Sequence, residues 1–391
     1  MWKYRLLYLA AIAASLIVFL VADRREPLVL LCILALAPLV SAGIQRAAMR
    51  SLSVNFQVRE SCRLGQKVPV TFTVRRKSRL PLGVIRINVK FINLLFKEEE
   101  GQEICLQPGE SREMVFQYLF EARDCGAVRI QAGNADCYDM LGLFRWSNTA
   151  APEQQVTVYP PELQLNVDLS RRPETIDSGE LYDQNRKGQD VSEVSDLRDY
   201  IPGDALHSVH WKLSGKMDRL IIREFGHPSN YNTLLLYEVM KKAGGREISH
   251  QCNNAVLSLA GALSYSMMQM NLEHNVGRIH MGEIRAVPVH SLETHEQMVL
   301  NMLSLPVLEE ESSLNTVYLF LRGNLRSEFT KIIYITPVFS DQAIRQLSEE
   351  VDLTVIQVAE EKKAGYTASA GYTVIPVDAG TYQENVQNII I

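Results

Sequence analysis

The stretch that decides the fold runs from Gly188 to Glu224 and reads GQDVSEVSDLRDYIPGDALHSVHWKLSGKMDRLIIRE. Before it, apolar residues recur with a period of two, and after it, continuous apolar runs alternate with helical patterns. Within it, the tripeptide at 202–204 (Pro-Gly-Asp) indicates a turn, and its Asp can cap the segment that follows. The stretch therefore joins two parts of different fold class.

Several side chains of this stretch have the chemistry of a functional site. Asp204, His210 and Ser214 supply the carboxylate, base and hydroxyl of a hydrolase triad. However, Val209, Trp211 and Leu213 alternate with polar residues, which predicts a short strand. On a strand, His210 and Ser214 would lie about 13 Å apart at ~3.3 Å per residue, and no GxSxG elbow is present. We predict no catalytic residue, with a hydrolase using Asp204 and His210 as the alternative.

Two non-catalytic interpretations explain the same residues. In the first, Arg198 and Arg223 pair with neighbouring carboxylates through bidentate hydrogen bonds, under the ring of Trp211. In the second, these three side chains anchor a protein partner, because interface hot spots favour Trp, Tyr and Arg. The motif residues that we assign to these roles are Arg198, Asp199, Tyr200, Gly203, Asp204, His210, Trp211, Lys212, Ser214, Arg223 and Glu224.

The stretch resembles the signature of the DUF58 family. The resemblance is carried by Asp190 with Glu193, Leu197-Arg198-Asp199-Tyr200, Pro202-Gly203-Asp204, His210-Trp211-Lys212-Leu213-Ser214 and Arg223-Glu224. Asp199 stands where Glu is more usual, and Gly215 where Ala is more usual. The resemblance implies two N-terminal membrane helices, a β-sandwich and a degenerate von Willebrand A-like domain. It also implies a partnership with a MoxR-type AAA+ ATPase, alongside a transglutaminase-like membrane protein.

Upstream of the motif, the period of two continues from residue 51 to about residue 161. The apolar positions include 54, 56 and 58, then 68, 70, 72 and 74, then 85, 87, 89 and 91, and later 114, 116, 118 and 120. Turn residues separate these runs, which predicts an antiparallel β-sandwich. Since no histidine pair or glycine-rich loop interrupts it, we interpret this part as a spacer or interaction module.

The chain begins with two apolar runs. Residues 6–22 and 27–45 carry no formal charge, and four charged residues at 23–26 separate them. Each run is just long enough to cross the hydrocarbon core as a helix, because about 20 residues are needed and the range begins near 17. A cleaved signal peptide is the alternative, but a second apolar run so soon afterwards argues against simple secretion. We predict a two-helix membrane hairpin with the lipid bilayer as its partner.

The charges beside the two runs predict the orientation of the hairpin. Lys3, Arg5, Arg46 and Arg50 lie on the side where the chain starts and returns, whereas the turn carries two arginines. Because basic residues favour the cytoplasmic side, we expect a multi-pass protein of the cell membrane with cytoplasmic soluble domains.

From residue 230 onward, the pattern predicts an α/β domain. Alternating strands and helices imply a mainly parallel sheet with helices on both faces, and this order resembles a von Willebrand A fold. The predicted strands include Thr233–Val239, Lys331–Thr336 and Leu353–Val358, and the predicted helices include Ser249–Asn271, Glu293–Leu303 and Asp341–Val351.

The metal site of a von Willebrand A fold has lost its ligands in this sequence. That site needs Asp-x-Ser-x-Ser at the end of the first strand, because a hard cation prefers oxygen ligands. Tyr237, Val239 and Lys241 replace the Asp and both Ser residues, and Thr336-Pro337 stand where a later acidic ligand is expected. We predict no metal, and a metal-dependent adhesion protein is a further alternative that the lost ligands disfavour.

The composition excludes several other classes of function. The net charge of −5 and the pI of about 6.0 argue against nucleic acid as a partner. No Walker A, GxGxxG, HExxH or CxxC motif is present, so no nucleotide, cofactor or zinc site is expected. We divide the chain into a membrane hairpin (1–48), a β-sandwich (49–165), a signature arm (166–229) and an α/β domain (230–391). The predicted function is a non-enzymatic, membrane-anchored interaction or scaffold module.

Overall fold

The computed structural model describes the chain apart from residues 1, 22–25, 79, 108, 110, 140, 149–152, 169–181, 189–193, 200–208, 218, 229–232, 311–312, 324, 361–366, 370–371, 386–387 and 391. The chain splits into two compact units. The first contains Met1–Pro161 with Leu303–Pro306, and the second contains Glu162–Met302 with Val307–Ile391.

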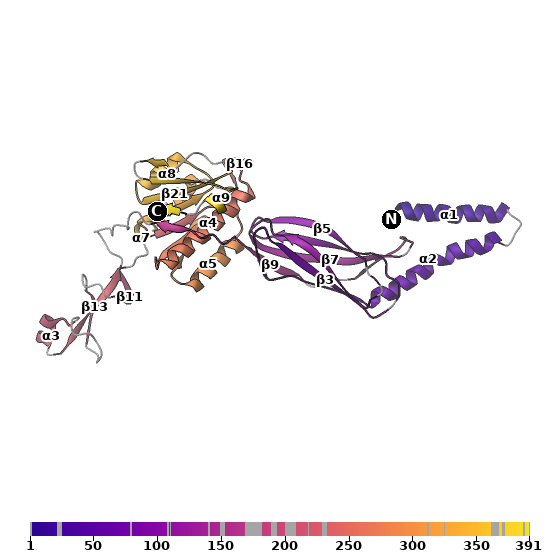
Figure 1. The fold of residues 1–391 in the computed structure, drawn as a ribbon, viewed down its shortest axis with the longest axis horizontal. Coiled ribbons are helices and arrows are strands. Elements are labelled where there is room, and N and C mark those ends of the chain that lie inside the picture. Colours follow the sequence, from indigo (N-terminus) through magenta and orange to yellow (C-terminus); the bar gives the residue numbers. More distant parts are fainter. Residues whose placement is uncertain are drawn as a thin grey trace. The chain divides into compact units, whose positions relative to one another are not determined.

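The first unit begins with two helices that pair as a hairpin, α1 (Trp2–Val21) and α2 (Glu26–Arg50) (Figure 1). Their apolar side chains are exposed along most of both helices. The hydroxyl of Tyr8 donates a hydrogen bond of 2.7 Å to the carbonyl oxygen of Leu34, which fixes the register of the pair. Both helices are long and apolar enough to cross a membrane.

Two β-sheets follow the hairpin without a linker, since β1 begins two residues after α2 ends. The strands are β1 (Leu52–Gln57), β2 (Ser61–Arg63), β3 (Lys67–Arg76), β4 (Ile85–Asn93), β5 (Glu98–Leu106), β6 (Glu113–Glu121), β7 (Gly126–Tyr138), β8 (Arg145–Asn148) and β9 (Gln154–Tyr159). One sheet has the order β1-β3-β6, and the other has the order β2-β9-β7-β4-β5 with β8 added beside β7. We refer to residues 139–144 as the β7–β8 turn.

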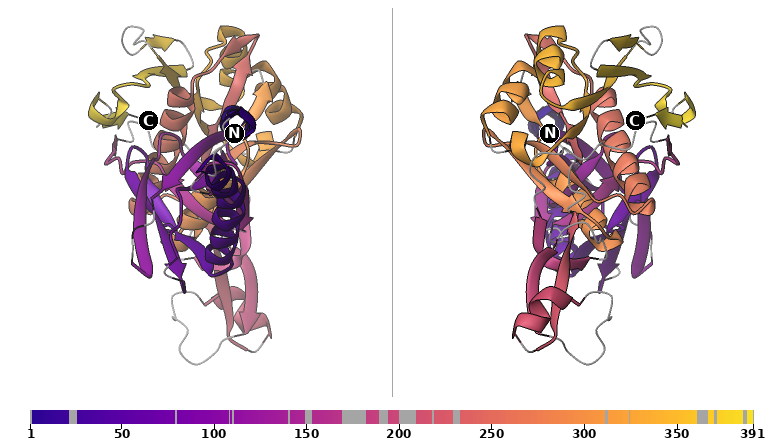
Figure 2. Two further views of the ribbon diagram at one scale, coloured as in Figure 1. Left: turned by 90° about the vertical axis from the view of Figure 1, so that its right-hand side faces the viewer. Right: turned by 90° about the vertical axis from the view of Figure 1, so that its left-hand side faces the viewer.

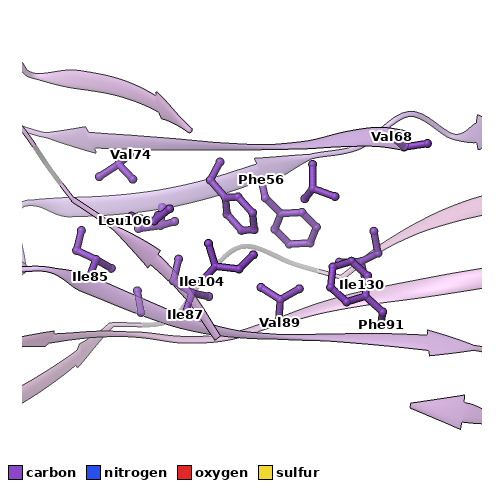
Figure 3. Packing of buried hydrophobic residues seen from close by; sticks show 14 of the residues in the cluster. Phe56, Val68, Val74, Ile85, Ile87, Val89, Phe91, Ile104, Leu106 and Ile130 are labelled. Carbon is purple, nitrogen blue, oxygen red and sulfur yellow. The ribbon is translucent and has the colours of Figure 1, made fainter. Parts of the chain in front are cut away.

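The two sheets share one hydrophobic core, because their inward side chains alternate along each strand. In β4, Ile85, Ile87, Val89 and Phe91 are buried while the residues between them are exposed. Figure 3 shows these side chains facing Phe56 and Val74 of the other sheet. The predicted sandwich is thus recognisable, with one difference: β2 pairs with β9 in parallel, whereas the other described pairs of both sheets are antiparallel.

The second unit starts with the segment that carries the sequence motif. It contains β10 (Asn166–Asp168), β11 (Tyr182–Gly188), β12 (Val194–Asp199), α3 (Trp211–Met217) and β13 (Ile221–Pro228). Strands β11, β13 and β12 form a three-stranded antiparallel sheet, and β10 pairs in parallel with β24 (Asn388–Ile390). Helix α3 lies beside the first residue of β13, Ile221 (Figure 2).

A seven-stranded sheet forms the core of the second unit. Its strands are β14 (Thr233–Tyr237), β17 (His274–His280), β18 (Glu283–Val289), β20 (Lys331–Thr336), β21 (Asp352–Ala359), β22 (Thr367–Ser369) and β23 (Tyr372–Asp378), in the order β18-β17-β14-β20-β21-β23-β22. The five inner strands are parallel and the two edge strands are antiparallel. The order of the strands reverses between β14 and β20, as in a doubly wound sheet.

The remaining elements surround this sheet. They are β15 (Met240–Ala243), β16 (Arg246–Glu247), β19 (Leu308–Glu310), α4 (His250–Gln269), α5 (Leu292–Ser304), α6 (Ser313–Arg322), α7 (Leu325–Glu328), α8 (Asp341–Ser348) and α9 (Tyr382–Asn385). Helices α6 and α8 pack on the face that carries Leu234 and Leu236. Helix α4 contacts β14, β17, β20 and β21, and Ser249 caps it by accepting the amide of Cys252.

Candidate functional site

The motif residues 211–217 form helix α3, not the short strand that their alternation predicted. The cause lies in local hydrogen bonds around His210. Its carbonyl oxygen accepts the amides of Leu213 at 3.0 Å and Ser214 at 2.9 Å, which are helical contacts. Its own amide donates to the carbonyl oxygen of Ile221 at 2.8 Å, so the start of the helix is tied to β13.

The hydroxyl of Ser214 is fully engaged in backbone hydrogen bonds. It donates to the carbonyl oxygen of His210 at 3.1 Å and accepts the amide of Ile221 at 2.9 Å. The side chain is buried and joins α3 to the first residue of β13. A nucleophilic serine needs a base that takes its proton, and here the proton points to a backbone carbonyl. The geometry of Ser214 therefore fits a structural link.

The ring of His210 also serves the backbone. Its Nδ1 accepts the amide of Leu213 at 3.2 Å, an arrangement that resembles a helix cap. When Nδ1 accepts a hydrogen bond, Nε2 is the ring nitrogen that carries the proton. Asp204, the third member of the hydrolase alternative, lies outside the described residues, as do Tyr200 and Gly203. The two described members thus make local backbone contacts.

Trp211 lies on the surface. It is 64% exposed at the first position of α3, although the network interpretation placed its ring over a buried cluster. Lys212, Gly215 and Lys216 share the exposed side of the helix, since residues four apart on a helix are neighbours. A Cβ at Gly215 would meet nothing within 4 Å, so the surface of the helix is unobstructed at this position, one turn after Trp211.

The two lysines of α3 repel each other mildly. Lys212 and Lys216 are four residues apart, and like charges at this spacing cost about 0.2–0.5 kcal/mol. Neither lysine makes an ion pair with another of the described residues. Met217 and Leu220 extend the exposed apolar area beside them. We name Trp211, Lys212, Lys216, Met217 and Leu220 the α3 surface.

The arginines and acids of the motif lie on two paired strands. Leu197 pairs with Arg223, Arg198 with Ile222, and Asp199 with Ile221. Asp196 pairs with Glu224 in the same ladder. The structure describes the backbone of these residues, and the ion pairs of Arg198 and Arg223 stay a prediction. The register does bring Asp199 beside Ile221, which contacts both His210 and Ser214.

A second polar cluster occupies the point where the strand order of the seven-stranded sheet reverses. Glu238 follows β14 and is 2% exposed. Its Oε2 accepts the hydroxyl of Thr336 at 2.7 Å, and its Oε1 accepts the hydroxyl of Thr316 from α6. The amide of Glu238 donates to the carbonyl oxygen of Ile335 at 3.0 Å. Both threonines are fully buried, and the cluster lies at the position where open α/β sheets usually bind ligands.

Two of the residues at the positions predicted for lost metal ligands, Tyr237 and Lys241, contact other side chains. Tyr237 is buried under the guanidinium of Arg278, which lies 5.8 Å from the ring centroid. Burial raises the pKa of Tyr237, and the charge of Arg278 opposes that rise. Lys241 pairs with Glu309 at 3.2 Å. Among the described residues, no group of three or more His, Cys, Asp or Glu side chains could hold a metal ion.

The cluster of Glu238, Thr316 and Thr336 was not predicted from the sequence. One signal was available: Glu238 is the only charged residue in the apolar stretch 233–240, which predicts a buried carboxylate that needs donors. The donors lie 78 and 98 positions further along the chain, so spacing alone does not identify them.

The comparisons with known proteins identify one family. Residues 196–364 match the family described as "Protein of unknown function DUF58". The chain is also 22% identical to the uncharacterized protein YeaD of Bacillus subtilis over 250 residues, which are 62% of this chain and 58% of that protein. The aligned region is therefore less than two thirds of the length of YeaD.

Similar solved structures cover only part of the chain. One is a cohesin module from a family 33 glycoside hydrolase of Clostridium perfringens, with 7% identity, a TM-score of 0.22, and coverage of 28% of this chain and 96% of the module. Another is a CARDB domain from Pyrococcus furiosus, with 19% identity, a TM-score of 0.19, and coverage of 27% and 91%. These scores carry no argument about function.

Proposed function

With a DUF58 region at residues 196–364 as the premise, we propose that this protein is a membrane-anchored, non-catalytic module that binds other proteins through its α3 surface. The exposed ring of Trp211 is the observation that carries the proposal. A large aromatic side chain is costly to leave in water, and Trp is enriched at the centres of protein interfaces.

The two N-terminal helices support the membrane anchor. Helix α1 has 20 residues and α2 has 25, and both are long and apolar enough to cross a membrane. Their apolar side chains face outward, which is unfavourable in water and favourable in lipid. The basic residues Lys3, Arg5, Arg46 and Arg50 beside the open ends of the hairpin favour a cytoplasmic location for both soluble parts.

We further propose that the α/β part of the second unit is a von Willebrand A-like domain whose metal site has become a structural cluster. Its support is the doubly wound strand order and the position of Glu238 beside the reversal of that order. Each carboxylate oxygen of Glu238 already accepts a threonine hydroxyl. This arrangement favours a metal-free protein over a metal-dependent adhesion protein.

The engagement of Ser214 and His210 supports a non-catalytic role for the motif. A hydrolase using Asp204 and His210 needs a free base near a nucleophile, and the described contacts of the imidazole serve the start of α3. The motif then has a structural role. Ser214 and His210 attach helix α3 to β13 through hydrogen bonds, and Trp211 stays exposed on the α3 surface.

The chemistry of the α3 surface defines the partner that it fits. Two lysines without ion pairs among the described residues, next to an indole and two further apolar side chains, complement an acidic surface that contains a hydrophobic pocket. We propose a MoxR-type AAA+ ATPase as this partner, with a transglutaminase-like membrane protein in the same assembly, as the family resemblance implies.

A binding measurement with the full chain in lipid nanodiscs tests this function. A purified MoxR-type ATPase is titrated onto the wild type, the double variant Lys212→Glu and Lys216→Glu, and the control Lys242→Glu, whose lysine is exposed on β15. We expect the double variant to bind at least about tenfold more weakly, with a smaller salt dependence, and the control to bind like the wild type. Equal binding by all three would reject the α3 surface, and no binding by the wild type would reject the ATPase as partner.

A further inference from the structure

The β7–β8 turn of the sandwich contacts both N-terminal helices. The Nε of Arg5 donates to the carbonyl oxygen of Leu143 at 3.0 Å, and the hydroxyl of Ser41 donates to Oδ2 of Asp139 at 3.1 Å. Asp139 is 4% exposed, and its Oδ1 accepts the amide of Phe144 at 2.8 Å. One buried carboxylate thus shapes the turn and attaches it to α2. These bonds place the turn at the level of Arg5 and Ser41 along the hairpin.

The burial of α2 changes at the same level. Val40 and the apolar residues before it are largely exposed, whereas Gln45, Ala48 and Met49 are buried against the sandwich. The amide nitrogen Nε2 of Gln45 contacts the sulfur of Cys137 at 2.6 Å, and burial raises the pKa of that thiol to about 11. The sandwich therefore begins to cover α2 near Ser41, and before that point the apolar side chains of α2 that do not face α1 are exposed, which is favourable in lipid.

The length of α1 determines how deep this level lies in a bilayer. The uncharged part of α1, residues 6–21, extends about 24 Å at 1.5 Å per residue, which is at the lower limit for crossing a hydrocarbon core of about 30 Å without help from the residues that flank it. A short apolar helix draws flanking residues toward the bilayer, or thins the bilayer around itself. Either response brings the level of Arg5, and with it the β7–β8 turn, into the headgroup layer.

The side chains exposed at this level have the chemistry of that layer. Trp2 is 76% exposed, Tyr4 is 66% exposed and Phe144 is 38% exposed. Lys3 and Arg46 add two exposed cations at the same end of the unit, and the exposed Arg145, which pairs with Asp136 at 3.5 Å, adds a third. Aromatic rings concentrate at membrane interfaces, and cations near them attract anionic lipid headgroups. We name these six residues the collar: Trp2, Lys3, Tyr4, Arg46, Phe144 and Arg145.

We propose that the collar is a lipid-binding surface, and that the sandwich rests on the bilayer through the β7–β8 turn with anionic phospholipid headgroups as its ligand. The inference rests on the proposed membrane anchor and adds a headgroup site that joins the ends of the two helices to the β7–β8 turn. Three observations carry it: the hydrogen bonds that fix the turn to the hairpin, the short apolar length of α1, and the aromatic and basic composition of the collar.

Quenching of tryptophan fluorescence by brominated phospholipids tests the collar in the full chain. The three native tryptophans are replaced with Phe, and single reporters are introduced by Phe144→Trp in the turn, Leu36→Trp in the middle of α2, and Leu119→Trp on β6. Leu119 is the matched control because it is exposed and lies far from the hairpin. It pairs with Pro69 of β3, which is seven residues from Arg76, and Arg76 lies at the end of β3 that is next to α2. Vesicles contain an anionic phospholipid brominated either close to the headgroup or near the end of the acyl chain.

We expect the Phe144→Trp reporter to be quenched most by the lipid brominated close to the headgroup, Leu36→Trp by the deeper bromine, and Leu119→Trp by neither. Quenching at Leu36→Trp without quenching at Phe144→Trp overturns the collar and leaves the membrane anchor intact. Absence of quenching at Leu36→Trp overturns the anchor itself. A protein that keeps native Trp146 as its single reporter needs no change in the turn, and its ring lies 5.8 Å from Phe144, so it must show the same shallow quenching.

Discussion

The hydroxyl of Thr336 donates a hydrogen bond of 2.7 Å to the carboxylate of Glu238 across the point where the strand order of the seven-stranded sheet reverses. The bond links the end of β20 to the residue after β14, and Thr316 adds a third element, α6. Three buried and hydrogen-bonded side chains thus lie at the position that other doubly wound sheets use to bind ligands.

Removal of the carboxylate should therefore destabilise the second unit. We expect Glu238→Ala to lower the free energy of unfolding by about 2–4 kcal/mol, because two buried hydroxyls lose their acceptor and the substitution leaves a cavity. The control Glu309→Ala removes the exposed partner of Lys241 and should cost no more than about 1 kcal/mol. Urea unfolding of the full chain in detergent measures both. Similar losses for the two variants would contradict a structural role for Glu238.

Divalent cations should not stabilise the protein. A ligand of the native state raises the melting temperature, and the oxygens of Glu238 are already bound to threonines. We expect the melting temperature of the full chain to be the same with magnesium, calcium or a chelator. A rise with either cation that Glu238→Gln abolishes would show that this cluster binds metal.

The link between α3 and β13 should depend on one hydroxyl. Ser214→Ala removes a donor and an acceptor at once, so the amide of Ile221 loses its buried acceptor. We expect hydrogen exchange at Ile221 to accelerate by roughly tenfold or more, corresponding to a loss of about 1–3 kcal/mol. Lys216→Ala on the exposed side of the same helix is the control and should leave the rate unchanged. Unchanged exchange in both variants would mean that Ser214 does not hold the helix.

Stability should fall in mild acid because of one buried histidine. His274 is fully buried, its Nδ1 donates to the carbonyl oxygen of Leu272 at 2.9 Å, and its Nε2 accepts the hydroxyl of Ser264 at 2.8 Å. Burial lowers its pKa below the ordinary value of 6.5, and the nearby His295 lowers it further. Below that value the unfolded chain takes up a proton that the folded protein does not, so stability decreases as the pH falls, by at most about 1.4 kcal/mol per pH unit.

The variant His274→Gln isolates this effect. We expect its melting temperature to depend less on pH than that of the wild type between about pH 7 and pH 5, even though the variant is less stable overall. His290→Gln, which changes an exposed histidine, should keep the slope of the wild type. An unchanged slope in His274→Gln would assign the acid sensitivity to other groups.

The sequence predicted the regular elements better than the motif. In β4 and β3 the period of two extends over nine and ten residues, and continuous apolar strands such as β20 have a distinct composition, so both patterns were read correctly. In the motif, three apolar positions over five residues fit a strand and a helical turn equally well. The hydrogen bonds of His210 and Ser214, which decide for the helix, depend on a partner in β13.

The candidate site was predictable only in its residue types. Trp211 was identified from the motif, but its exposure depends on Leu213 and Ser214 turning inward on a helix. The cluster around Glu238 depends on contacts between residues about a hundred positions apart, which no local pattern encodes. Asp204, Tyr200 and Gly203 lie outside the described residues, so their roles stay predictions.

Photo-crosslinking from position 211 in native membranes tests the central claim most directly. A photoreactive amino acid replaces Trp211 or, as the matched control, Tyr318, an exposed aromatic residue on α6. We predict a discrete protein adduct from position 211, absent from position 318, that disappears when Lys212 and Lys216 are both changed to Glu while the melting temperature is unchanged. No adduct at position 211, or the same adducts from both positions, would contradict the proposal that the α3 surface binds another protein.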